Sequence, residues 1–294
     1  MRLKHFFLIL GIILIWGFNF AVVKVGLIHI PPLFLVFLRF FLTSIPLIFF
    51  VKKPDVPLRL LFSYGVVMFA LQFGMLFSAM QSGITAGLAS ILLQVQVFFA
   101  LALAAIVFKE KLFKTQILGA VIAFLGIALI GKNLGDEITL AGFILVIGAA
   151  CCSAPGNALS KKMGNVDMLG VVVWSSFFAW PLLLIFSLYF EGYGMIMQSF
   201  QSMTWKSCSS ALYVTYLSTL LGYYVWNDLI AKYSVGKIAP FTLLSPVFGM
   251  ISSTLIFKEP LPVWKLFSAI LILTGLGLHI IGPKLETQRL YKKD

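Results

Sequence analysis

Long runs of apolar residues, broken only by short polar stretches, fill the sequence from end to end. A helix needs about 20 apolar residues to cross the roughly 30 Å hydrocarbon core of a bilayer. Charges and Pro/Gly clusters divide the chain into segments of that length, which predicts an all-α integral membrane protein. The ten predicted transmembrane helices cover residues 5–28, 33–51, 60–80, 84–107, 115–131, 140–160, 168–190, 210–231, 236–257 and 264–282.

The composition supports a lipid environment. Hydrophobic residues make up 61% of the chain and charged residues 11%, whereas soluble domains average about 45–50% and about 25%. The net charge of +12 would suggest a nucleic-acid partner in a soluble protein. Here the charges lie in short clusters between apolar runs, so we expect the partners to be the lipid bilayer and a small molecule, and no nucleic acid.

The distribution of Lys and Arg predicts the orientation, because cytoplasmic loops carry their excess. With the N-terminus inside, most fall in the inner loops. The outer loops hold only Lys132, Lys206, Lys258 and Lys265. We therefore expect both termini to be cytoplasmic. The first apolar run continues through Val23 without a small-residue cleavage pattern, which favours a retained helix over a signal peptide.

Matched residues indicate an internal repeat. FKEKL at 108–112 recurs as FKEPL at 257–261, and Asn19 and Lys24 match Asn157 and Lys162. Five helices per copy would place the copies in opposite senses across the membrane, as in many secondary transporters. We expect one repeat over 1–134 and the other over 135–294, exchanging conformations by alternating access around a central site.

The sequence resembles the EamA branch of the drug/metabolite transporter (DMT) superfamily in three features. These are WGFNF at 16–20, residues 32–39 entering the second helix, and an acidic residue after the fourth and ninth helices. The stretches most similar to its subgroup of bacterial O-acetylserine/cysteine exporters are 16–26, 56–65, 86–99 and 156–162. This resemblance implies export of small amino-acid metabolites across the bacterial inner membrane, through a cavity lined by helices of both halves.

Other function classes stay open on the sequence. A DMT transporter of other amino acids or of drug-like amphiphiles, or an importer, would have the same cavity with another lining. A membrane binding protein that transports nothing would have a closed core. No HExxH, GxSxG or P-loop motif is present, so we do not expect an enzyme. We expect no cofactor, no metal site and no disulfide, and a monomer, with a dimer as the alternative.

Polar groups inside a membrane are costly, so each one is a candidate for the cavity. Aromatic side chains with polar tips and a helix-breaking proline join them. The candidates are Asn19, Arg39, Gln94, Gln96, Asn157, Trp174, Tyr223, Asn227 and Pro246.

Each candidate also has a structural interpretation. Arg39 could bind a substrate carboxylate or lock neighbouring helices, and the two asparagines could bind a ligand or join helices. Gln94 and Gln96 lie about 200° apart on an ideal helix, so at most one should face a cavity. Tyr223 and Asn227 share a helix face, and Pro246 is either a hinge or a simple kink.

We also predict structural roles for charged residues near helix ends. We expect Glu110 and Glu259 to cap the helices that follow them, and Lys24 to extend toward the interface. No Asp or Glu falls at the centre of a predicted span, and Asp228 comes closest, so proton coupling through a mid-membrane carboxylate is not expected. Residues 194–206 form either an amphipathic interfacial helix or a loop.

Overall fold

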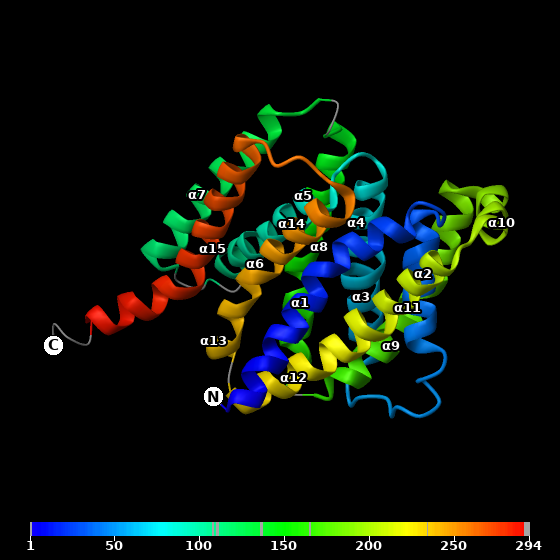
Figure 1. The fold of residues 1–294 in the computed structure, drawn as a ribbon. Coiled ribbons are helices and arrows are strands. Elements are labelled where there is room, and N and C mark those ends of the chain that lie inside the picture. Colours follow the sequence, from blue (N-terminus) through cyan, green and yellow to red (C-terminus); the bar gives the residue numbers. More distant parts are fainter. Residues whose placement is uncertain are drawn as a thin grey trace.

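A computed structural model describes residues 2–107, 109, 112–135, 138–164, 166–233 and 235–290. Throughout this described part the chain is helical and contains no strand beyond an isolated bridge between Gly135 and Ile138. In chain order the elements are α1 (Leu3–Gly26), α2 (Pro32–Ser44), α3 (Leu58–Tyr64), η1 (Gly65–Leu71), α4 (Gln72–Gln81), α5 (Ala86–Leu92), η2 (Leu93–Val95), α6 (Gln96–Val107), α7 (Lys114–Lys132), α8 (Leu140–Met163), α9 (Met168–Phe190), α10 (Gly192–Ser202), α11 (Trp205–Leu212), η3 (Tyr213–Leu221), α12 (Gly222–Tyr233), α13 (Val235–Ile238), η4 (Ala239–Leu243), α14 (Leu244–Phe257) and α15 (Val263–Leu290) (Figure 1).

Among the described residues, eight helical segments are long and apolar enough to cross a membrane. They are Leu3–Gly26, Leu58–Gln81, Ala86–Val107, Lys114–Lys132, Leu140–Met163, Met168–Phe190, Pro240–Phe257 and Val263–Pro283. The chain is therefore an all-helical, multi-pass membrane protein. α2 is shorter than predicted, because its α-helix ends at Ser44 and residues 45–50 form turns.

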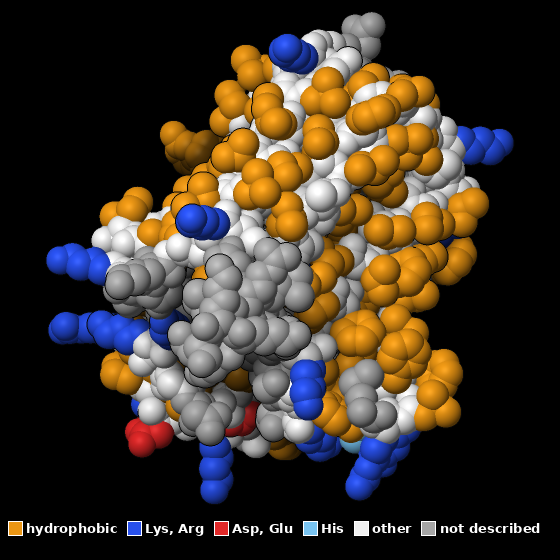
Figure 2. All heavy atoms as spheres, turned by 90° about the vertical axis from the view of Figure 1, so that its left-hand side faces the viewer, with side chains coloured by type: hydrophobic (Ala, Val, Ile, Leu, Met, Phe, Trp, Pro, Cys, Tyr) orange, Lys and Arg blue, Asp and Glu red, His pale blue; other side chains and the backbone are white. Residues whose placement is uncertain are grey.

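The outer surface is apolar, as lipid contact requires. Large side chains that a soluble protein would bury are exposed, such as Phe124, Phe267 and Ile270 on α7 and α15. Figure 2 shows one face on which hydrophobic side chains form a broad continuous surface, while Lys and Arg project at its edges. A contiguous apolar surface of this extent is typical of a membrane-embedded protein.

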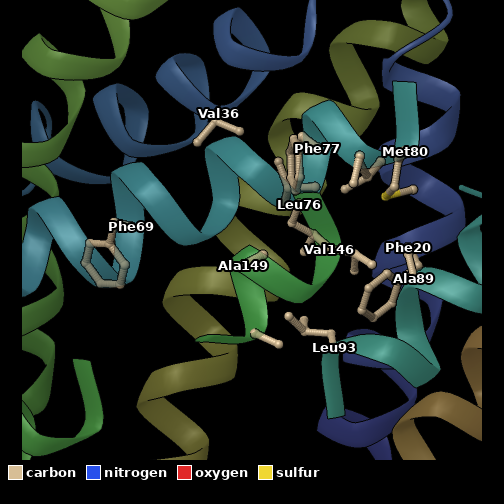
Figure 3. Packing of buried hydrophobic residues seen from close by; sticks show 14 of the residues in the cluster. Phe20, Val36, Phe69, Leu76, Phe77, Met80, Ala89, Leu93, Val146 and Ala149 are labelled. Atoms are coloured by element: carbon tan, nitrogen blue, oxygen red, sulfur yellow. The ribbon is translucent and has the colours of Figure 1, made fainter. Parts of the chain in front are cut away.

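The interior is packed where several helices meet. Leu76 and Phe77 of α4 approach Val146 and Ala149 of α8, and Phe20 of α1 lies nearby (Figure 3). The small side chains of α8 let the neighbouring backbone come close, as is common between membrane helices. This packing positions α1, α4 and α8 around the middle of the bundle.

Four short segments depart from α-helical geometry. η1 and η3 are π-helical, whereas η2 and η4 are 3₁₀-helical, so the order π, 3₁₀ occurs twice along the chain. π segments occur frequently at functional sites because they redirect side chains and leave carbonyls less constrained. The segment predicted as either a helix or a loop at 194–206 contains α10, which begins at Gly192 and ends at Ser202.

Candidate functional site

A cavity of about 190 Å³ lies in the middle of the bundle, between helices from both halves of the chain. Its lining residues are Trp16, Asn19, Phe20, Arg39, Met68, Gln72, Phe73, Leu76, Leu93, Gln94, Gln96, Ser218, Tyr223 and Ser245. Five of the predicted candidates are therefore brought together: Asn19, Arg39, Gln94, Gln96 and Tyr223. Because π segments η1 and η3 contribute Met68 and Ser218, the irregular backbone lies beside this central cavity.

Arg39 is the buried cation of the central cavity, with only 2% of its surface exposed. Its Nε donates a hydrogen bond to Thr219 Oγ1 at 2.8 Å, and its guanidinium carbon lies 4.1 Å from the centre of the Phe73 ring. Its Nη1 has no hydrogen-bond partner. No ion pair in the described part of the chain involves Arg39, so its charge is held by a hydroxyl and aromatic faces.

Two further residues of the cavity carry unsatisfied polar atoms. Asn19 Oδ1 and Gln72 Oε1 are both buried without a hydrogen-bond partner, although Gln72 Nε2 donates to Gln96 Oε1 at 3.4 Å. Leaving a buried polar atom unpaired costs about 1–3 kcal/mol. One cavity thus gathers an unpaired cationic donor and two unpaired acceptors, an arrangement that a ligand with complementary groups would satisfy.

The prediction that at most one of Gln94 and Gln96 faces the cavity is wrong. Both line it, and Gln94 Nε2 also lies 3.5 Å from the carbonyl of Thr242. The reason is local geometry: the 3₁₀ segment η2 spans Leu93–Val95, so the 100° step of an α-helix does not hold between the two glutamines.

Four candidates lie outside the central cavity, and three of them, Trp174, Asn227 and Pro246, have a structural partner. Trp174 Nε1 donates to the carbonyl of Val51, and Asn227 Nδ2 donates to the carbonyl of Tyr223 in its own helix. Pro246 is buried, and its carbonyl accepts a hydrogen bond from Ser90 Oγ at 3.4 Å. The interpretation as helix-stabilising residues fits these three better than direct contact with a ligand.

Asp228, the acidic residue that comes closest to the centre of a predicted span, forms an exposed ion pair. Its Oδ2 lies 2.7 Å from Lys232 Nζ, one turn along α12. This pair places the carboxylate at the surface and away from the central cavity lining.

A second cavity, of about 460 Å³, adjoins the central one, since Met68 and Gln96 line both. Asn157 belongs to this second cavity, together with Gln116 and His279. Gln116 is the third residue of α7, and Asn157 lies in the last two turns of α8. These positions place the second cavity toward the membrane side on which α1 begins, here named the Leu3 side.

Glu259 joins three segments on the opposite side, where α1 ends, here named the Gly26 side. Its Oε1 lies 2.6 Å from Lys24 Nζ of α1. The same carboxylate accepts hydrogen bonds from the amides of Ala86, at 3.2 Å, and Gly87, at 3.4 Å, which begin α5. Glu259 is thus a helix cap, but the amides that it satisfies belong to α5 and not, as predicted, to the helix that follows it. Glu110, the other predicted cap, lies outside the described residues.

The environment of Glu259 favours its charged form. Burial alone would raise its pKa, but hydrogen bonds from Lys24, Ser253 and the Gly87 amide, with the charge of Lys24, lower the pKa below its ordinary value. About a third of the Lys24 side chain is exposed near the end of α1, and its ammonium group pairs with Glu259.

Glu191 forms a second junction on the Gly26 side. Its carboxylate accepts hydrogen bonds from the amides of Leu33, at 2.6 Å, and Phe34, at 3.1 Å, in the first turn of α2. Ser187 Oγ donates a third bond at 2.6 Å. Burial is the largest influence on Glu191 and raises its pKa, while these bonds oppose the shift. The loop after α9 is thereby fixed to the start of α2.

Sequence reasoning missed several lining residues. Gln72 lies inside a span and meets the same criterion that selected Gln94, so the signal was present in the sequence. His279 falls at the end of the predicted helix 264–282, but α15 continues to Leu290 and places it within the helix. Ser218, Ser245 and Met68 are too common in membrane helices to carry a signal.

Comparisons with known proteins agree with this architecture. The sequence model of the EamA-like transporter family matches residues 3–132 and again 140–281. A Salmonella typhimurium protein described as "Probable amino-acid metabolite efflux pump" is 41% identical over 96% of both chains. An Escherichia coli strain K12 protein with the same description is 37% identical, also over 96% of both chains.

The fold has a counterpart among solved structures. One crystal structure superimposes with a TM-score of 0.58 at 18% sequence identity, covering 95% of this chain and 98% of that chain. At this identity the likeness concerns the fold alone. The family match spans nearly the whole chain, and the chain is a membrane transporter, not an enzyme, that belongs to the EamA-like transporter family in the drug/metabolite transporter superfamily.

Proposed function

We propose that the protein exports small zwitterionic amino-acid metabolites, of the cysteine and O-acetylserine kind, across the bacterial inner membrane. The observation that carries this proposal is the set of unpaired atoms around the central cavity. A substrate carboxylate would accept hydrogen bonds from Arg39 Nη1, and a substrate ammonium group would donate to Asn19 Oδ1 and Gln72 Oε1. Because these atoms are buried, side-chain rotations would have to bring them to the ligand. Charge-assisted hydrogen bonds of this kind are the strong ones.

The size of the cavity favours a small metabolite. Sites for drug-sized ligands measure about 300–1,000 Å³, whereas the central cavity holds about 190 Å³. This volume argues against a drug-like amphiphile as the substrate. The descriptions of the two relatives as amino-acid metabolite efflux pumps support the same substrate class and the outward direction.

The transport cycle we propose is alternating access between two inverted repeats, residues 1–134 and 135–294, each of five helices. α2 with the turns after it, and the run α11–η3–α12, would complete ten spans beside the eight long apolar segments. The recurrence of a π and then a 3₁₀ segment supports the repeat. The excess of Lys and Arg supports a cytoplasmic Leu3 side and cytoplasmic termini. We propose a monomer as the transporting unit.

Export from cells tests the proposal. Overexpression of the wild type should raise external cysteine or O-acetylserine several-fold over cells carrying an empty vector. Arg39→Met should abolish the rise at equal membrane abundance, whereas Asn227→Leu, which removes a bond within its own helix and lies outside the cavity, should keep most of it. If overexpression changes neither metabolite nor any other amino acid outside the cells, the exporter interpretation falls.

The role of Arg39 has a sharper test in proteoliposomes. The amine cysteamine, which lacks the carboxylate, should compete with cysteine weakly for the wild type. It should compete more strongly for Arg39→Lys, because lysine cannot reproduce the planar contacts of the guanidinium and cysteine then loses the advantage of its carboxylate. If Arg39→Met transports cysteine at the wild-type rate, Arg39 has a purely structural role.

A further inference from the structure

Polar side chains from four different helices converge on the second cavity. Gln96 begins α6, Gln116 lies in α7, Asn157 in α8 and His279 in α15. Intramembrane polar residues are rare and costly, and they commonly mark substrate paths. The remaining lining is apolar: Met68, Val97, Ala100, Leu101 and Ala104. A single polar group would be common in such a cavity, but four polar side chains from separate helices give it the lining of a binding site.

His279 adds a second observation. Its Nδ1 is buried and has no hydrogen-bond partner, and its ring packs edge-on against Phe98 at 5.8 Å between centroids. An imidazole nitrogen and three carboxamides offer both donors and acceptors, and no Asp, Glu, Lys or Arg is among the described residues of this lining. This chemistry suits a small solute that carries both charges and is neutral overall.

Met68 connects this cavity to the central one. It lies in the π segment η1 and lines both cavities. A Cβ added to Gly156 of α8 would lie 3.0 Å from Met68 Cγ and closer still to its Sδ, so the thioether is seated where glycine leaves room. Methionine has flexible torsions and readily changes its packing, which suits a side chain that must move when a ligand passes.

We infer that the second cavity is a separate loading site for the transported zwitterion on the Leu3 side, from which the substrate passes Met68 to the central cavity. The inference rests on the proposed function and extends it to two binding sites per chain. The loading site recognises its ligand by the amides of Asn157 and Gln116 and the imidazole of His279, whereas the central site uses Arg39.

Equilibrium binding of radiolabelled O-acetylserine to the purified protein in nanodiscs tests the two-site arrangement. We expect the wild type to bind about two molecules per chain, and both Asn157→Leu and Arg39→Met to bind about one. Asn133→Leu, an equivalent change at the end of α7 and outside both cavities, should keep two. A protection experiment uses Arg39→Met, in which only the loading site should bind ligand. Diethyl pyrocarbonate, which modifies histidine, should react with His279 more slowly when O-acetylserine is present.

The outcomes separate this inference from the proposed function. The wild type could bind only one molecule per chain, with binding lost in Arg39→Met and kept in Asn157→Leu. This result would overturn the loading site and leave the exporter proposal intact. Binding of none would overturn both. Gly156→Ala gives an independent readout, because it displaces Met68 without removing a polar group: two molecules should bind, and export should slow several-fold. If Gly156→Ala exports at the wild-type rate, the substrate does not pass Met68.

Discussion

Lys24 and Glu259 lie 2.6 Å apart on the Gly26 side and tie α1 to the segment between α14 and α15. The same carboxylate satisfies the first amides of α5, so one buried side chain closes the end of the bundle across both halves of the chain. In a cycle of alternating access, this junction has to open for release on the Gly26 side.

Removing one partner should loosen that junction. Glu259→Gln and Lys24→Met should each lower stability by about 1–3 kcal/mol, because the remaining partner loses a charged hydrogen bond in a largely buried setting. Thermal unfolding in detergent should show a midpoint lower by roughly 2–4 °C per kcal/mol. Lys132→Met, an exposed lysine on the same side, is the control and should change the midpoint little.

The same carboxylate predicts a dependence on pH. The folded-state pKa of Glu259 is lowered, so its stabilising contribution is complete above the unfolded pKa of about 4.3 and is lost as the pH falls through the lower folded value. The wild-type midpoint should therefore fall more steeply than that of Glu259→Gln between about pH 5 and about pH 3. Parallel curves would show that folding does not lower the pKa of Glu259.

Glu191 should respond to substitution differently from Glu259. Its carboxylate accepts three bonds, but burial raises its pKa, so a neutral acceptor is tolerated there. Glu191→Gln should cost less stability than Glu191→Ala, which leaves the first turn of α2 uncapped at a cost of about 1–2 kcal/mol. Unfolding midpoints of the two variants at neutral pH check the order, and equal losses would contradict it.

The hydrogen bond between Arg39 and Thr219 should affect transport. Thr219→Val removes the acceptor for Arg39 Nε while keeping the side-chain shape. Loss of this hydrogen bond should cost about 1–1.4 kcal/mol of binding free energy, so we expect the KM for cysteine to rise about 5- to 10-fold. Thr219→Ser keeps the hydroxyl and should restore most of the affinity. If both variants match the wild type, Thr219 does not position the guanidinium.

Two glycines on α15 make a matched pair. A Cβ on Gly275 would approach the carbonyl of Gly119 in α7, with Ala123 Cβ only 2.9 Å away, whereas nothing lies within 4 Å of a Cβ on Gly277. Gly275→Ala should separate α7 from α15 and lower the unfolding midpoint. Gly277→Ala should leave it unchanged or raise it, since alanine favours helix by about 0.8–1 kcal/mol over glycine. The reverse order would show that close packing at Gly275 is unimportant.

The fold was accessible from sequence because lipid imposes one dominant rule, that spans are long, apolar and helical. The helix limits at 140–160 and 168–190 were accordingly predicted within a few residues. The site was only partly predictable. Arg39 and Asn19 stood out as polar groups in spans, but the joint exposure of Gln94 and Gln96 depends on a 3₁₀ turn that apolar periodicity does not reveal.

Contacts between distant segments were beyond the sequence for a different reason. The first helix after Glu259 in the chain is α15. The carboxylate of Glu259 nevertheless bonds the start of α5, which lies 173 residues away in the sequence. A prediction from sequence assigns a capping side chain to the nearest helix start. Which helix start lies next to that side chain depends on how the helices pack.

The cap on α5 also bears on the order in which the chain matures. Glu259 emerges from the ribosome long after Ala86 and Gly87 have entered the membrane. Until then the start of α5 has to find water or lipid headgroups for its free amides. The N-terminal half made alone would therefore lack the acceptor that Glu259 provides for these amides in the complete chain.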